Sequence, residues 1–120
     1  VPLFTDKRQD RQRAAAVSRR GAEHLDRDAV LLDLRRQLDQ ALTDWQRFNE
    51  RVDLYRSALG ERARQTAEAS ITTYANGQTD FAELIRSQLA ELEVALKRAE
   101  LETRAGQSWA RIVYLAGEVS

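Results

Sequence analysis

The chain has 120 residues, of which 32% are charged, and its mean hydropathy is −0.59. So many charged residues leave little apolar surface for a compact core, which favours an elongated shape. Nineteen basic and nineteen acidic residues balance, so no net field attracts nucleic acid or an anionic membrane surface. The absence of cysteine excludes disulfides and thiolate metal sites, and no apolar run is long enough to cross a bilayer as a helix.

The chain opens on a short apolar stretch that precedes a long helix. Pro2 is the only proline, and residues 1–5 are predicted to be the end of a β-strand or a linker. Thr5 or Asp6 has the short side-chain oxygen that caps a helix by accepting a free amide hydrogen. The helix itself is predicted over residues 6–74.

Heptad patterns run along this helix and along a second helix predicted over residues 80–118. Spacings that alternate between three and four residues average 3.5, which predicts left-handed supercoiling of paired helices. Gly21 and Gly60 lack the neighbouring proline or polar cluster that would end the first helix. The predicted first seam consists of Leu31, Leu34, Leu38, Ala41, Trp45, Phe48, Val52, Tyr55 and Leu59. The predicted second seam consists of Ala82, Ile85, Leu89, Leu92, Leu96, Ala99, Thr103, Gly106, Ala110 and Val113.

Helix-breaking residues are concentrated between the two helices, in the stretch YANGQTDF. A turn is predicted at residues 75–79, with Gly77 at a positive φ angle that glycine adopts without strain. Thr79 or Asp80 is predicted to cap the second helix, and Asp80 with Glu83 has the spacing of a capping box. The fold class predicted from these elements is all-α, a long antiparallel helical hairpin of coiled-coil type.

The two predicted helices differ in length. At about 1.5 Å per residue the first would be roughly 100 Å long and the second roughly 57 Å. Residues 7–36, which include the alanine-rich stretch RQRAAAVSRRGAEH, would therefore have no partner within the chain. The exposed apolar positions predict that the chain associates with other helices, including those of further copies.

The stretch PLF, the long Gln/Arg/Ala-rich helix, the tip pattern Tyr-x-x-Gly-x-x-Asp-Phe and the ending YLAGE together resemble the TolC-like outer membrane efflux proteins. The chain is most similar to the heavy-metal and cation efflux branch, over the helical part of the second repeat. The resemblance implies a fragment of a trimeric α-barrel tunnel in the periplasm. The β-strands that would carry the protein through the outer membrane would lie outside this chain.

The resemblance also implies functional residues and partners. Glu83 lies where the family has acidic residues that line the closed tunnel entrance. Arg86 departs from that acidic pattern and could instead pair with Glu83 across the entrance. The implied partners are two further copies in the full-length protein, a periplasmic adaptor protein and, indirectly, an inner-membrane pump. The residues implied to contact the adaptor at the periplasmic tip are Tyr74, Asn76, Gly77, Gln78, Thr79, Asp80 and Phe81.

Enzymatic activity is not expected, since no nucleophile has a base at motif spacing and no phosphate-binding loop is present. His24 is the single histidine, and an isolated imidazole on a charged helix is usually solvated, so neither a metal site nor a cofactor is predicted. Two other functions fit a helical hairpin: the coiled-coil hairpin of a periplasmic adaptor, and a spectrin-like interaction module. The spectrin-like alternative predicts a compact three-helix bundle with breaks near Gly21 or Gly60.

Overall fold

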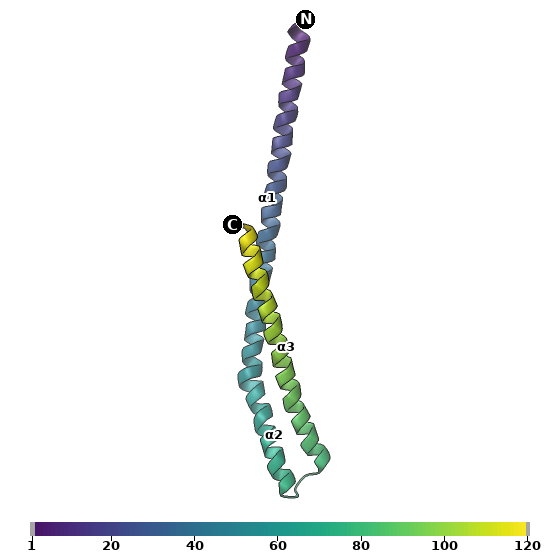
Figure 1. The fold of residues 1–120 in the computed structure, drawn as a ribbon, viewed down its shortest axis with the longest axis vertical. Helices are drawn as coiled ribbons and strands as arrows, with labels where there is room; N and C mark the ends of the chain where they lie inside the picture. The colour runs from purple at the N-terminus through teal and green to yellow at the C-terminus, as the bar shows by residue number, and fades with distance from the viewer. Residues whose placement is uncertain (1, 120) are drawn as a thin grey trace.

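The structure is a computed structural model that describes the backbone of residues 2–119 and the side chains of residues 6–119. It consists of α1 (Pro2–Leu54), a π-helical turn η1 (Tyr55–Leu59), α2 (Gly60–Ala75) and α3 (Phe81–Val119). Figure 1 shows α1, η1 and α2 as one continuous arm, and α3 as a second arm that returns antiparallel to it. The predicted all-α hairpin is confirmed.

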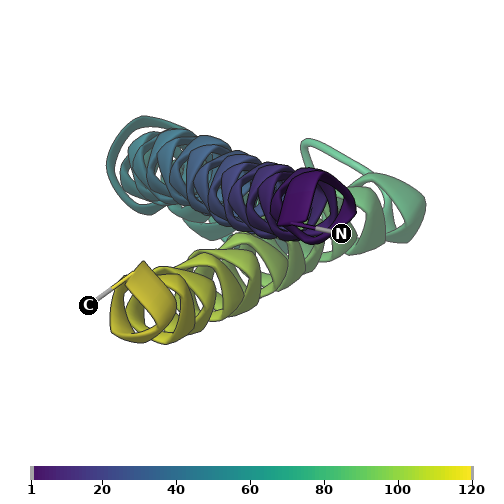
Figure 2. The ribbon, with the colours of Figure 1, turned by 90° about the horizontal axis from the view of Figure 1, so that it is seen from above.

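The molecule is a rod. It measures 110 × 22 × 14 Å with a radius of gyration of 30.2 Å, whereas a compact domain of this length would have a radius of about 14 Å. Viewed along the rod, the two arms lie side by side and cross at an angle, with no third arm beside them (Figure 2). The chain therefore does not fold back at Gly21 or Gly60, and it is not the compact bundle of the spectrin-like alternative.

The N-terminal end of α1 corrects the prediction of a strand end or linker. α1 begins at Pro2 and not at residue 6, so residues 2–5 belong to the helix, and Val1 lies outside the described residues. Proline is accepted in the first helical turn because its missing N–H would have no intrahelical partner there. A β-strand needs a neighbouring strand for its hydrogen bonds, and residues 2–119 contain none.

The seam predicted for the first arm is confirmed, because all of its positions except Leu31 are buried or half-buried. Near the end of α3, Ala41 forms a buried cluster with Ile112 and Leu115. Leu34, Leu38 and Trp45 pack against this cluster. The seam therefore holds α1 against the C-terminal half of α3.

The seam predicted for α3 is wrong. Every one of its positions is exposed in the hairpin; Leu96, for example, is 61% exposed. The buried face of α3 is a neighbouring stripe that contains Leu101, Ala105, Ile112 and Leu115. That inner stripe also contains the half-buried Glu91 and Arg98, and Arg98 pairs with Glu102 at 3.0 Å. We call the exposed stripe through Ile85, Leu89, Leu92, Leu96 and Val113 the outer face of α3.

The π turn η1 is a feature that the sequence did not predict. A π turn contains one residue more than an α turn. Residues four apart in the sequence therefore stay on the same face of a π turn, whereas in an α-helix each would be rotated away from the face of the one before it. A Cβ atom on Gly60 would clash with the Tyr55 carbonyl oxygen. Gly60 is thus required by the close approach of this carbonyl. The inner positions aligned across this region are Tyr55, Leu59, Ala63 and Ala67.

Candidate functional site: the hairpin tip

The tip turn comprises residues 76–80, one residue later than predicted, because α2 continues to Ala75 and α3 begins at Phe81. Gly77 has φ = 71°, which confirms its predicted positive φ angle. α3 continues to Val119, one residue beyond the predicted end. The chain therefore reverses direction within five residues between two long helices.

Two backbone hydrogen bonds close the end of α2 around Gly77. The Gly77 N–H donates to the Tyr74 carbonyl at 3.0 Å, and the Gln78 N–H donates to the Thr73 carbonyl at 2.9 Å. This pair of bonds is the Schellman motif, which satisfies helix-terminal carbonyls and places a left-handed residue just after the helix. The tip is thus a defined turn whose geometry depends on Gly77.

Asp80 caps α3, as one of the two predicted alternatives stated. Its Oδ1 accepts a hydrogen bond from the Glu83 N–H at 2.8 Å. The Glu83 carboxylate lies 3.3 Å from the Arg86 guanidinium, and both side chains are more than half exposed. The structure thus pairs Glu83 with Arg86 within one chain. An exposed pair of this kind contributes little to stability, because water screens it.

Two aromatic rings form the apolar part of the tip. The centroids of Tyr74 and Phe81 are 5.9 Å apart, in an edge-to-face arrangement that aromatic pairs prefer. Phe81 is 60% exposed and Tyr74 is 42% exposed. The two rings pack against each other at the turn, and their exposed parts leave apolar surface available for contact. Asn76 and Gln78 are also exposed, and Thr79 is half-buried.

Gly77→Val is expected to destabilise the tip by about 1–3 kcal/mol, because a β-branched residue is strained at positive φ. The rest of the hairpin should keep its helix content, since a Cβ at Gly77 would meet no atom within 4 Å. Thermal unfolding followed by circular dichroism measures the change. Gln78→Val is the matched control and should have a much smaller effect; equal effects of the two variants would contradict the strain argument.

The tip thus exposes aromatic and polar side chains between the ends of two helices. Comparison with known protein families, curated proteins and solved structures finds no match. Among the described residues, no group of three or more His, Cys, Asp or Glu side chains is placed to hold a metal ion. None of the described helices is long and apolar enough to span a membrane.

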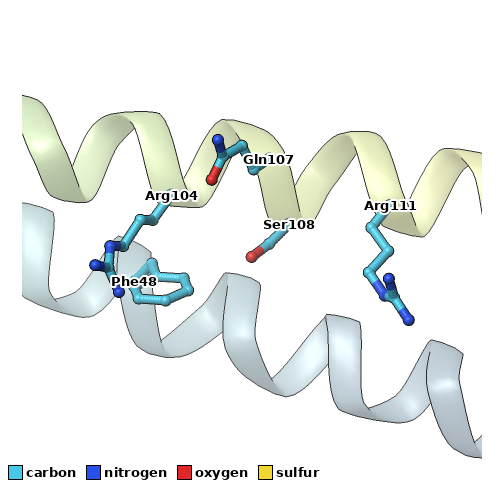
Figure 3. Close-up of a pocket in the computed structure, with 5 residues that line it drawn as sticks. All are labelled: Phe48, Arg104, Gln107, Ser108 and Arg111. Atoms are coloured by element: carbon cyan, nitrogen blue, oxygen red, sulfur yellow. The ribbon is translucent and has the colours of Figure 1, made fainter.

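A shallow groove of about 350 Å³ lies between the arms, far from the tip (Figure 3). Phe48 lines it from α1, and the other lining side chains come from α3, including Arg104 and Arg111. Both arginines already have partners: Arg104 pairs with Glu100 at 3.1 Å, and Arg111 donates to the Gln37 side chain at 3.1 Å. The groove is therefore explained by packing between the arms.

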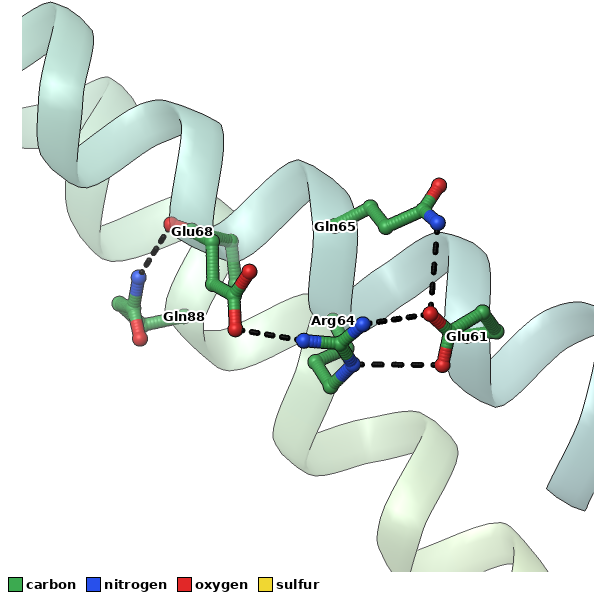
Figure 4. A network of polar contacts seen from close by, with 6 residues as sticks. Glu61, Arg64, Gln65, Glu68 and Gln88 are labelled. Carbon is green, nitrogen blue, oxygen red and sulfur yellow. Dashed lines mark hydrogen bonds and ion pairs between the residues drawn. The ribbon is translucent and has the colours of Figure 1, made fainter.

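A network of polar side chains lies on α2, on the tip side of η1 (Figure 4). Arg64 binds two carboxylates of its own helix, those of Glu61 and Glu68. Across the hairpin, the Gln88 amide donates to the Ala67 carbonyl at 3.1 Å. Gln88 was not predicted as a contact residue. Its signal in the sequence is the run of small inner residues on α2, which lets a long polar side chain reach the backbone. Close to the tip, the arms are thus joined by polar contacts.

The hydrogen bond from Arg64 lowers the pKa of Glu61 below its usual range. Because the pKa of Glu61 is lowered, its interaction with Arg64 is intact at pH values above the usual pKa range of glutamate. The interaction is lost as the pH falls through the lowered pKa. In Arg64→Gln the pKa of Glu61 should return toward the ordinary value, which a ¹³C NMR titration of the carboxyl group measures. Arg62→Gln is the control, because Arg62 is exposed and forms no ion pair among the described side chains. An unchanged titration of Glu61 in Arg64→Gln would disprove the assignment.

Proposed function

We propose that this chain is a wall segment of the periplasmic tunnel of a TolC-like outer membrane efflux channel. The channel would export metal ions or drugs as part of a tripartite pump. The observation that carries the proposal is that α3 has two apolar faces. Its inner stripe packs on the first arm, and its outer face is exposed, with Leu89 at 51%, Leu92 at 53% and Leu96 at 61%.

A helix in the wall of a tunnel has a neighbour on each side, which explains two apolar faces on one helix. If the outer face contacted only water, a continuous apolar stripe would remain unburied. Such a stripe on a soluble helix marks an interaction site. In the proposed channel the outer face packs on a helix of a neighbouring subunit or repeat, and three copies complete the tunnel. The protein would be located in the outer membrane, with this segment in the periplasm and the membrane crossed only by strands outside this chain.

The tip supplies the contact with the adaptor in this proposal. The exposed edge of the Tyr74 and Phe81 ring pair gives an apolar patch, and the Gly77 turn fixes how it is presented. Glu83 and Arg86 would lie at the tunnel entrance as a pair of opposite charge. The inner-membrane pump would be reached indirectly, through the adaptor. The proposal assigns no catalysis and no cofactor to the segment.

One property disfavours the adaptor hairpin: the stretch YANGQTDF lacks the arginine, leucine and serine pattern of adaptor tips.

The proposal is tested in a bacterial strain without its own outer membrane efflux channels. The full-length protein that contains this chain is expressed with its adaptor and pump, and resistance to divalent metal ions and to hydrophobic drugs is measured. Leu92→Lys on the outer face should abolish any resistance gained, whereas Glu93→Lys, the exposed neighbouring residue, should preserve it. Full resistance with Leu92→Lys, or no resistance with the unsubstituted protein, would count against the channel.

A further inference from the structure

The heptad spacing of the first arm continues in the sequence beyond Leu59, but the structure packs a different stripe of α2 on α3. The stripe that the structure packs on α3, which we call the first face of α2, consists of Ala63, Ala67 and Ser70. The stripe on the continued spacing of three and four residues, which we call the second face, consists of Arg62, Thr66, Ala69 and Thr73. The second face is exposed except for the half-buried Thr73.

The extra residue of the π turn η1 is what separates the two faces. If the π turn relaxes to an α turn, every residue of α2 rotates by one position, about 100° around the helix axis. The second face then points at α3, and the heptad spacing is unbroken from Leu34 to Thr73. From this geometry we infer that η1 is a joint with two positions. In the π position the first face of α2 packs on α3, and in the α position the second face does.

Either face of α2 fits against α3, because the contact between these two helices is small. All residues of α3 from Phe81 to Glu100 are exposed or half-buried, and the first buried residue is Leu101. Both faces of α2 consist mainly of alanine, serine and threonine, so exchanging them changes the volume between the arms little. A groove of about 230 Å³ between the arms beside η1 leaves room for the rotation. The inference rests on these contacts within the hairpin and does not depend on the proposed channel.

Different polar contacts favour the two positions. In the π position the Gln88 amide donates to the Ala67 carbonyl at 3.1 Å and lies 3.5 Å from the Ser70 hydroxyl oxygen. In the α position Arg62 enters the groove beside η1, which Glu91 lines from α3. Neither Arg62 nor Glu91 forms an ion pair among the described side chains. The rotation therefore brings together two opposite charges, which attract each other at the partly buried surface between the arms.

The joint is coupled to the hairpin tip. α2 has 16 residues, about 24 Å of helix, and it carries its rotation to Tyr74 near its end. The Tyr74 ring then moves away from the Phe81 ring, from which its centroid is 5.9 Å distant in the π position. The aromatic pair at the tip is thus formed in one position of the joint and lost in the other. By linkage, a partner that binds the ring pair holds η1 in the π position.

Gly60→Ala is the substitution that selects the α position. The added Cβ would clash with the Tyr55 carbonyl oxygen in the π turn, whereas an α turn accepts alanine without strain. Gly21→Ala is the matched control, because a Cβ at Gly21 meets no atom within 4 Å. Circular dichroism verifies that both variants keep their helix content.

Engineered cysteines report which face of α2 points at Gln88, since the chain has no cysteine of its own. Ala67→Cys with Gln88→Cys reports the first face, and Thr66→Cys with Gln88→Cys reports the second. Glu68→Cys with Gln88→Cys is the control pair, because Thr66 and Glu68 flank Ala67 on opposite sides and Glu68 belongs to neither face. Intramolecular disulfides formed by mild oxidation of dilute protein are measured by mass spectrometry.

The Ala67 pair should form its disulfide fastest in the unsubstituted background and in Gly21→Ala. In Gly60→Ala the Thr66 pair should form roughly tenfold faster than before and the Ala67 pair roughly tenfold slower, because disulfide formation requires the two Cα atoms to be close. An Ala67 pair that remains the fastest in Gly60→Ala would overturn the inference. The unsubstituted background gives a test without Gly60→Ala: visits to the α position should make the Thr66 pair form several-fold faster than the Glu68 pair, and equal rates would overturn the inference.

A double-mutant cycle tests the ion pair of the α position. Arg62→Gln and Glu91→Gln are made singly and together, with and without Gly60→Ala, and urea unfolding gives the equilibrium constant of each variant. With Gly60→Ala, the effect of the double substitution should differ roughly threefold from the product of the single effects, which shows that the two residues interact. Without Gly60→Ala the effects should multiply. Independent effects in the presence of Gly60→Ala would overturn the pairing of Arg62 with Glu91 and with it the second position.

Discussion

Leu101→Ala is expected to destabilise the hairpin by about 2–5 kcal/mol, the range for truncating a buried leucine. Leu101 is 1% exposed, and among the described residues it is the large side chain that the hairpin buries most completely. Alanine would leave a cavity between α3 and the first arm, because long helices held by many other contacts cannot collapse onto one missing side chain. Urea unfolding followed by circular dichroism measures the loss.

Leu96→Ala is the matched control for this prediction. It makes the same chemical change on the same helix, but Leu96 is 61% exposed on the outer face. An exposed truncation of this kind changes stability by only about 0.5 kcal/mol. Both variants are compared at one protein concentration, since association adds to apparent stability. If Leu96→Ala proved the more damaging variant, the outer face would be the packed face, and the orientation of α3 described above would be wrong.

Gly60→Ala is expected to destabilise the first arm by about 1–3 kcal/mol, although alanine is normally the better helix former. The added Cβ would clash with the Tyr55 carbonyl oxygen, a backbone atom that cannot move aside without opening the π turn. Opening it to an α turn would rotate α2 relative to α1 and carry Ala67 and Ser70 away from α3. Thermal unfolding therefore should occur several degrees lower than in the unsubstituted chain.

Gly21→Ala makes the same substitution at a glycine that has room for a Cβ atom. A Cβ at Gly21 meets no atom within 4 Å, so this variant should gain about 0.5–1 kcal/mol of helix stability. Thermal unfolding followed by circular dichroism should show a higher unfolding temperature for Gly21→Ala and a lower one for Gly60→Ala than for the unsubstituted chain. A stabilising Gly60→Ala would mean that the π turn is not held by the requirement for glycine at this position.

Local chemistry predicted most of the hairpin tip. Gly77 and Asp80 have roles that depend on neighbouring backbone atoms, a positive φ angle in one case and a helix cap in the other, and both were confirmed. The limits of the turn were predicted one residue too early, because a helix end is set by the last hydrogen bonds that form. Glu83 and Arg86 pair within one chain because residues three apart are neighbours on a helix face. Whether Glu83 lines a tunnel entrance or pairs with Arg86 across it, the two alternatives left open by the resemblance, stays a prediction.

The sequence by itself determined the two long helices, the position of the reversal and the seam of the first arm, because heptad spacing, glycine and capping residues act over only a few neighbours. Tertiary structure decided which face of α3 is buried. Two stripes on α3 share the same spacing, and the purer one, through Leu89 and Leu96, is exposed. The buried stripe is the one whose Leu101 and Ile112 meet the first arm, and the charged residues among them obscured it in the sequence. The π turn at Gly60 was likewise decided by packing, since only contact with a second helix requires the inner residues of α1 and α2 to stay aligned.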